Sequence, residues 1–312
     1  VRIHHMAAQH NQRILGIGIS LGRPVSALLT SLESDGRANS EFNNGLPLHT
    51  RLDNTEITAW NGVAQQPDGK VVVAGEVVES GHMASIVVAR FLSNGTFDES
   101  FNQGRGYVLT ALDEHWAAGT AMTLQRDGKI VVAAFAKVGD ALVPVILRYW
   151  HSSSDAPSSA NAQASYLDPS FGKDGQVYLD FNGTTEGAIS AGALQPDQKI
   201  VVACSVGSGF GLARFNPDGS LDTGFGTGGR VTGEFNPQEL GLRVTGLHIF
   251  DDEKILRTAE QSDGIGNVPA IAKFNMDGSP DDGFGNNGKT IVSFIPPGQS
   301  HPLRGECGKS AV

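Results

Sequence analysis

The chain has 312 residues, 40 of them glycine, and a formal net charge of −10 at pH 7. An acidic surface repels phosphate backbones, which argues against a nucleic-acid partner. No apolar stretch approaches the roughly 20 residues that a membrane-spanning helix needs, so membrane insertion is not expected. No signal peptide is visible, but because the sequence starts at Val1 rather than at Met this excludes no export route. Short apolar runs separated by Gly, Asp, Asn and Pro predict an all-β protein.

One sequence block recurs five times along the chain. In its clearest copy, residues 193–203 (ALQPDQKIVVA) are followed by 211–222 (GLARFNPDGSLD) and by 224–226 (GFG). From the N-terminus, the copies of this block start at Gln9, Gln66, Gln125, Ala193 and Phe250. Each copy ends at a marker phenylalanine, and these are spaced by 54 to 70 residues: Phe42, Phe101, Phe171, Phe225 and Phe284.

Each copy contains four strand-like runs, which in the fourth copy are residues 175–181, 189–195, 199–203 and 211–216. A Pro-Asp-Gly or Pro-Asp-Gln turn joins two of them, because proline is preset for the second position of a turn. A lone four-stranded sheet exposes unpaired edges, and radial stacking of such sheets removes the problem. The sequence therefore predicts a five-bladed β-propeller with four antiparallel strands per blade.

The two ends of the chain suggest how the propeller closes. The chain opens within the second strand of the first copy, residues 3–9, and ends with a spare first strand after the fifth copy. We therefore expect the C-terminal strand to join the N-terminal blade and close the ring. A single domain over 1–312 would then hold blades at about 1–45, 46–105, 106–175, 176–229 and 230–288, the closing strand 289–295 and a polar tail 296–312.

The repeat resembles a known family. Residues 194–203 (LQPDQKIVVA) together with residues 212–229 (LARFNPDGSLDTGFGTGG) resemble the delta-60 repeat, a bacterial β-propeller domain of unknown function. The resemblance covers essentially the whole chain in five copies. It implies a propeller fold, and it brings no catalytic residue, cofactor or established ligand.

A basic and an acidic residue recur together at fixed places in the repeat. The pairs are Arg90 with Asp98, Arg148 with Asp168, Arg214 with Asp222 and Lys273 with Asp281, whereas the first copy has Ser31 and Asn39. Losing one partner alone would leave a buried charge unpaired, so the joint loss predicts a structural ion pair in four blades. Twelve inserted residues within 151–165 separate Arg148 from Asp168, and we expect a solvated loop there.

Two apparent catalytic motifs are explained by the repeat. Residues 18–22 (GISLG) fit the nucleophile elbow, but Ser20 falls in a strand-to-strand loop with no helix after it. Residues 224–229 (GFGTGG) fit a dinucleotide-binding motif but form the turn of the repeat itself, without the helix that meets a pyrophosphate. Neither motif predicts a catalytic or nucleotide site.

The metal-ligating residue types form no convincing site either. His4, His5 and His10 lie close in sequence, but neighbours in a strand point to opposite faces, which suits chelation poorly. The Asp-Gly-Ser turns lack enough oxygen ligands for calcium. Cys204 is expected to be a small buried thiol, and Cys307 lies in the polar tail. We expect no metal and no cofactor.

Candidate ligand-binding residues gather in the connections that vary between copies. Because strands alternate in direction, the two repeated turns of each copy share one end of the propeller, and the varying connections occupy the opposite, variable-loop end. The tryptophans there either cover junctions between blades or, with the carboxylates, form a channel mouth suited to sugars. The candidates are Asp53, Glu56, Trp60, Asp113, Glu114, His115, Trp116, Glu186 and Arg243.

Three functions fit this pattern. The lack of a catalytic motif favours a non-catalytic binding module, with a carbohydrate or a protein surface as ligand at the variable-loop end. A glycan-acting hydrolase is the alternative, and it needs channel carboxylates about 5–9.5 Å apart, one with a raised pKa. The third is a structural propeller in a larger surface or secreted assembly, consistent with a secreted, periplasmic or cell-surface location.

Overall fold

The computed structural model describes the chain except for residues 1, 10–11, 23, 82–83, 113–115, 153–165, 182–188, 208, 236–241, 263–266 and 293–312. Two compact units divide it, with the boundary between Tyr178 and Leu179. Apart from one 3-10 turn, Asn43–Gly45, the elements of the described residues are all β-strands. No helix in this part of the chain is long and apolar enough to cross a membrane.

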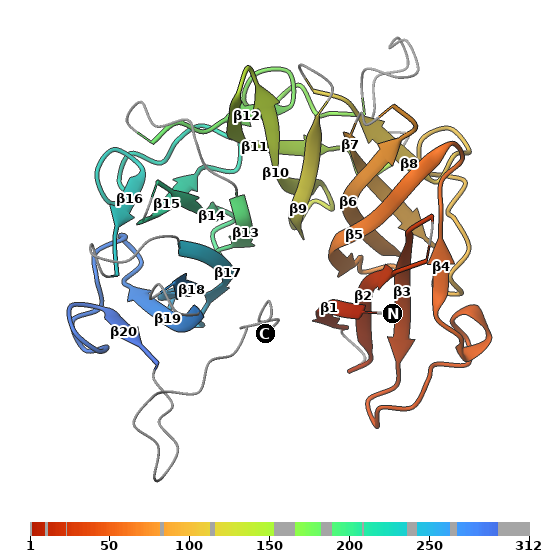
Figure 1. The fold of residues 1–312 in the computed structure, drawn as a ribbon, viewed down its shortest axis with the longest axis horizontal. Coiled ribbons are helices and arrows are strands. Elements are labelled where there is room, and N and C mark those ends of the chain that lie inside the picture. The colour runs from red at the N-terminus through yellow and green to blue at the C-terminus, as the bar shows by residue number, and fades with distance from the viewer. Residues whose placement is uncertain are drawn as a thin grey trace. The chain divides into compact units, whose positions relative to one another are not determined.

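The first unit contains three antiparallel sheets of four strands, and within each sheet the strands lie in chain order (Figure 1). The first sheet consists of β1 (Arg2–Ala8), β2 (Ile14–Ser20), β3 (Ser26–Leu32) and β4 (Leu48–Thr50). The second consists of β5 (Thr55–Gln65), β6 (Val71–Glu79), β7 (Ala84–Phe91) and β8 (Tyr107–Thr110). The third consists of β9 (Ala117–Leu124), β10 (Ile130–Val138), β11 (Ala141–Tyr149) and β12 (Gln176–Tyr178).

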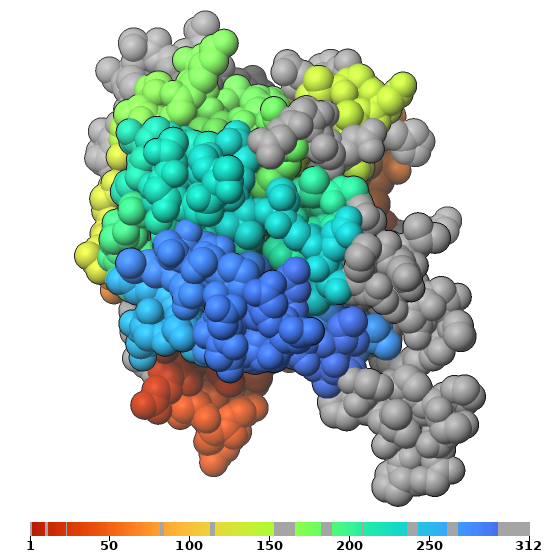
Figure 2. Space-filling model, turned by 90° about the vertical axis from the view of Figure 1, so that its left-hand side faces the viewer, coloured from red at the N-terminus to blue at the C-terminus, as the bar shows by residue number. Residues whose placement is uncertain are grey.

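The second unit contains two further sheets of the same kind, whose residues lie side by side in Figure 2 (cyan and blue). The fourth sheet consists of β13 (Ile189–Leu194), β14 (Ile200–Val206), β15 (Gly209–Phe215) and β16 (Arg230–Gly233). The fifth consists of β17 (Leu242–Ile249), β18 (Ile255–Ser262), β19 (Asn267–Phe274) and β20 (Lys289–Ile291). The fold is a five-bladed β-propeller with four antiparallel strands per blade, as the repeat predicts.

The predicted grouping of strands into blades is wrong by one strand. The C-terminal strand β20 pairs with β19, Ile291 opposite Ala270, and the first sheet takes its four strands from β1 to β4. The strand before each hairpin therefore completes the preceding blade, and the C-terminal strand does not complete the N-terminal one. The reason lies in the turn after each marker phenylalanine. In the third blade, Gly175 donates to the carbonyl of Phe171 and accepts from the amide of Arg148, which folds β12 back onto β11.

Both faces of the central strands are buried, which explains the runs of valine. Along β6, Val71 and Val73 belong to the apolar cluster shared with the first blade, and Val72 and Ala74 to the cluster shared with the third. Successive strand residues point to opposite faces, so a strand packed on both sides is apolar throughout. In the second unit, one cluster likewise joins β14 and β15 to β18 and β19.

A β-bulge recurs in the first strand of every sheet, and its extra residue is His4, Asn61, Thr120, Ser190 or Thr245. In the first and second blades the bulged side chains reach the next blade. His4 Nε2 lies 2.8 Å from the carbonyl oxygen of Trp60, and Asn61 Nδ2 donates to the carbonyl of Gly119 at 2.9 Å. A bulge re-aims its side chain out of the ladder, and here this links adjacent blades.

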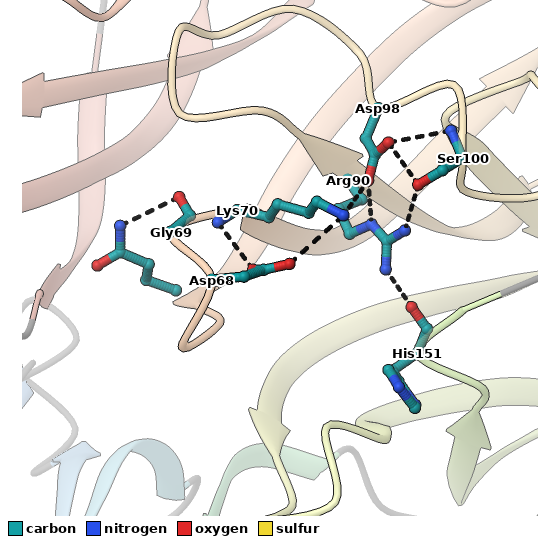
Figure 3. Close-up of polar contacts among 8 residues, drawn as sticks. Asp68, Gly69, Lys70, Arg90, Asp98, Ser100 and His151 are labelled. Carbon is teal, nitrogen blue, oxygen red and sulfur yellow. Dashed lines mark hydrogen bonds and ion pairs between the residues drawn. The ribbon is translucent and has the colours of Figure 1, made fainter.

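A buried ion network joins the two repeated turns of the second blade (Figure 3). The Asp98 side chain is 5% exposed, and its Oδ2 lies 2.7 Å from Arg90 Nε and 3.2 Å from Lys70 Nζ. The hydroxyl and the amide of Ser100 both donate to Asp98 Oδ1, at 2.7 and 3.0 Å. Both carboxylate oxygens are therefore satisfied, as a buried charge requires.

The same ion pair forms in the other blades that carry both charges. The shortest N–O distances are 2.8 Å for Arg148–Asp168, 2.7 Å for Arg214–Asp222 and 3.5 Å for Lys273–Asp281. In the first blade, Asn39 Nδ2 donates to Ser31 Oγ at 3.1 Å, so a neutral pair replaces the ions. These contacts confirm the predicted structural pairs. The hairpin lysine was not anticipated as a third member, yet it lies 3.0–3.1 Å from the same aspartate oxygen in the remaining blades: Lys129, Lys199 and Lys254.

The arginine of the network also contacts the neighbouring blade. The Arg90 guanidinium lies 4.7 Å from the ring centroid of Phe101 and donates through Nη1 to the backbone carbonyl of His151 in the third blade. In the second unit, Arg214 lies over Phe225 and donates to the backbone carbonyl of Met276 in the fifth blade. One side chain thus links a turn of its own blade to a turn of the next.

Removing the carboxylate should therefore destabilise the fold. We expect Asp98→Asn to lower the free energy of unfolding by about 3 kcal/mol, because Arg90 and Lys70 lose their counter-charge. Urea unfolding of the full chain measures this, with Asp68→Asn at the exposed end of the same hairpin as control, expected to cost less than about 1 kcal/mol. The double variant Arg90→Ser, Asp98→Asn copies the first blade and should recover part of the loss. Equal stability of the Asp98 and Asp68 variants would contradict the network's role.

Acid should weaken the same network. Burial alone would raise the pKa of Asp98, but the hydrogen bonds of Ser100 and the charges of Arg90 and Lys70 outweigh burial and lower it to about 2. An aspartate whose folded pKa lies below its unfolded value of about 3.9 stabilises the fold above that value, and this contribution disappears as the pH falls toward about 2. Thermal unfolding between these pH values should show a steeper loss for the wild type than for Asp98→Asn. Parallel curves would refute the assignment.

Candidate functional site

Four of the nine residues predicted to bind a ligand lie outside the described residues: Asp113, Glu114, His115 and Glu186. Of the others, Asp53, Glu56, Trp60 and Trp116 belong to the first unit and Arg243 to the second. The exposed Asp53 precedes β5, and the exposed Glu56 lies in β5, where its carbonyl accepts from the amide of Val25. The Arg243 side chain is 76% exposed, with Nη1 4.0 Å from Glu260 Oε2.

The two tryptophans occupy different environments. Trp60 is 0% exposed, belongs to the cluster between the first and second blades, and meets Phe91 edge-on with ring centroids 6.3 Å apart. A fully buried indole has no face for a ligand, so Trp60 covers a blade junction and is not a binding platform. Trp116 is half-buried and packs at a tilt against Phe135, with ring centroids 5.3 Å apart.

One half-buried carboxyl group in the described part of the chain has a pKa that is shifted upward, the direction that a general acid requires. Burial raises the pKa of Glu76 in β6. A glycosidase requires a second carboxylate at a defined separation. The candidates Asp53 and Glu56 are exposed, so neither gives Glu76 a buried carboxylate partner.

The second unit contains a groove of about 680 Å³, which the sequence did not predict. One wall is Phe235, in the variable connection between β16 and β17. The other wall is β20 with the tight turn before it, in which the amide of Asn286 donates to the carbonyl of Lys289 at 2.8 Å. The lining residues are Phe235, Gly285, Asn286, Asn287, Lys289, Thr290 and Ile291.

A side-chain contact beside the groove has an equivalent in the preceding blade. Lys289 Nζ donates to the carbonyl of Glu234 at 2.8 Å, and Arg230 at the corresponding place in β16 donates to the carbonyl of Asp180 at 2.6 Å. These contacts fix the connection that follows the outer strand of the preceding blade. They hold the backbone next to Phe235 in place, so this wall of the groove is part of the scaffold.

A buried arginine lies behind that wall. Arg257 in β18 is 0% exposed, and its guanidinium carbon lies 4.3 Å from the ring centroid of Phe210 and 5.4 Å from that of Phe235. Burial lowers the pKa of Arg257 to about 9. Its Nε, Nη1 and Nη2 atoms have no hydrogen-bond partner. An alignment of the repeats could have identified this residue, because it replaces a valine. The position three residues after the hairpin lysine is Val73, Val132 or Val202 in other blades.

Among the described residues there is no metal-binding cluster and no support for the nucleophile-elbow motif. No group of three or more His, Cys, Asp or Glu side chains among them could hold a metal ion. Cys204 is a free, buried cysteine, as predicted, whereas Cys307 falls outside the described residues. Ser20 ends β2 and is followed by β3 rather than by a helix, so the nucleophile-elbow motif has no structural support.

The sequence matches the family model of a β-propeller domain of unknown function, DUF5122, over residues 66–101, 195–225 and 252–284. Each matched segment runs from the hairpin turn to the marker phenylalanine, in the second, fourth and fifth blades. No curated protein matches the chain.

Solved structures of other proteins share the fold. An ulvan lyase of polysaccharide lyase family PL25 is 11% identical with a TM-score of 0.52, covering 92% of this chain and 68% of the lyase. A second structure of such a lyase, bound to a GlcA(1-4)Rha3S unit, is 12% identical with the same TM-score and coverage. Puromycin hydrolase is 11% identical with a TM-score of 0.50, covering 95% of this chain and 39% of the hydrolase. At these identities the likeness shows the fold alone.

The burial of Trp60 predicts what its removal would do. Trp60→Ala should lower the free energy of unfolding by about 3–5 kcal/mol, because it leaves a large cavity between two blades. Urea unfolding followed by circular dichroism measures the loss, and Trp116→Ala, at a half-buried indole, should cost clearly less. An unfolding midpoint for Trp60→Ala equal to that of the wild type would mean that the indole is not part of the core.

Proposed function

We propose that this protein is a non-catalytic binding module whose ligand is a carbohydrate held in the groove beside Phe235. The observation that carries the proposal is the lining of that groove. It combines one aromatic ring with amide, hydroxyl and ammonium groups, those of Asn286, Asn287, Thr290 and Lys289. An aromatic face packs on the apolar face of a sugar ring, while the polar groups pair with its hydroxyls.

The size of the groove favours a small or oligomeric ligand over a protein surface. Its volume of about 680 Å³ falls within the roughly 300–1,000 Å³ of small-molecule sites. A stable protein interface instead buries about 800 Å² on each partner and needs a broader face. The polysaccharide lyases with a similar fold act on glycans, and this adds support by analogy only.

A glycan array of the purified protein tests the proposal. We expect the double variant Asn286→Ala, Thr290→Val to bind its glycan about 10- to 30-fold more weakly, because two neutral hydrogen bonds are lost. Thr290→Val also installs the valine that the fourth blade carries at the corresponding Val231. The matched control is Thr227→Ala, at the equivalent exposed turn before β16, which should leave binding unchanged. A silent array, or equal loss in the control, would contradict a sugar site in this groove.

The same sample separates binding from cleavage. The hydrolase alternative rests on Glu76, whose pKa is raised by burial. Each glycan that binds is incubated with the wild type and with Glu76→Gln, and new reducing ends are measured. We expect none in either sample. Cleavage by the wild type that disappears in Glu76→Gln would replace the binding-module proposal with a glycan-acting hydrolase.

A further inference from the structure

Arg257 is a charged residue at a repeat position where three other blades carry the buried valines Val73, Val132 and Val202. It faces the cluster between the fourth and fifth blades, beside Ile255 and Ala259 on the same side of β18. Its register partner Ala272 occupies the same place as the partners of the core valines in other blades. The fold therefore does not need a cation here.

The flat faces of the Arg257 guanidinium contact aromatic rings, whereas the N–H groups at its edges have no hydrogen-bond partner. The rings of Phe210 and Phe235 accept the flat faces of the guanidinium. The edges carry five N–H donors in a rigid fork, and none of the three nitrogens has a partner. Such a fork fits a carboxylate or a sulfate in bidentate fashion, and a buried charge without such a partner is costly.

No described group of this unit supplies the missing negative charge. The Cys204 thiol interacts electrostatically with Arg257, but burial raises its pKa far above neutrality, so it carries no charge. Glu260 is three residues further along β18 and therefore on its opposite face, where it faces Arg243 at 4.0 Å. None of the described side chains of this unit therefore provides the counter-charge.

Phe235 connects this arginine to the groove. Its ring lies over the guanidinium and also lines the groove. Lys289, on the opposite wall, brings a second positive charge to 5.7 Å from the ring of Phe210. A ligand in the groove is therefore one aromatic ring away from an unpaired guanidinium, with an ammonium beside it.

We propose that Arg257 recognises an anionic group of the bound glycan, a uronate carboxylate or a sulfate ester, which reaches the guanidinium when the Phe235 ring turns aside. This inference rests on the proposed function and specifies its ligand class as acidic carbohydrate. The anion takes the edge N–H groups that no protein atom uses. A neutral sugar leaves them unpaired, so the same residue selects against neutral glycans.

Arg257→Val tests this directly, because it installs the residue that three other blades carry and should fold. Binding is measured by calorimetry with an oligouronate, a sulfated oligosaccharide and a neutral oligosaccharide of equal length. We expect the wild type to prefer one acidic ligand over the neutral one, and Arg257→Val to bind that ligand about 10- to 100-fold more weakly. The stronger of the two acidic ligands identifies the anionic group. The matched control Arg37→Ala removes an exposed arginine that is not among the binding candidates and should leave binding unchanged.

Thermal unfolding supplies a readout that does not depend on a glycan. Arg257→Val should raise the unfolding midpoint of the ligand-free protein, because it removes a buried, unpaired charge. Free glucuronate or inorganic sulfate should raise the midpoint of the wild type but not that of Arg257→Val.

The two proposals can fail separately. Glycan binding that persists unchanged in Arg257→Val, or equal affinity for acidic and neutral ligands, would overturn the role of Arg257 and leave the binding module intact. If no glycan binds, the proposed function fails. In that case a midpoint shift by the free anions that depends on Arg257 would retain an anion site, and the absence of such a shift would remove it.

Discussion

A carboxylate taken out of water must be met by positive charge and by hydrogen-bond donors, and this requirement organises four of the five blades. Asp98 is reached by an arginine from the third strand, a lysine from the first hairpin and a serine from its own turn. Three segments distant in sequence therefore meet at one side chain. Arg90 extends the constraint to the backbone of the third blade, so the same interaction that closes one blade positions another.

The first blade shows which parts of this arrangement can be exchanged. Ser31 and Asn39 form a neutral hydrogen bond where the other blades have an ion pair. The hairpin cation remains as Arg13, and it finds Glu33 and Glu41 instead, at 2.8 and 3.1 Å. Charge balance is thus kept by a local rearrangement. What the blade requires is a satisfied polar contact between the turns, and an ion pair is one of two ways to provide it.

The number of blades, the strands and the ion pairs could be predicted because each recurs, and recurrence separates a structural residue from chance. The grouping of strands could not be predicted, because a strand that lies between two copies of the repeat could pair with the blade before it or with the blade after it. In the third blade, the hydrogen bonds of the turn at Gly175 assign this strand to the blade before it. The choice between the two readings of Trp60, blade junction or channel mouth, depends on the bulge at Asn61. This bulge shifts the register and puts Trp60 opposite Gly75, in the place of the buried Val244. The groove beside Phe235 depends on side-chain packing between blades, which no single repeat encodes.

In a chain built from similar repeats, equivalent positions can carry residues with different roles. Valine occupies the Arg257 position in three blades, so the cost of a buried arginine is limited to the junction of the fifth blade with its neighbour. A substitution that would be severe in a unique core is confined to one junction out of several equivalent ones. In such an array, most copies can keep the residues that the scaffold needs, while one copy can carry a residue that serves another purpose.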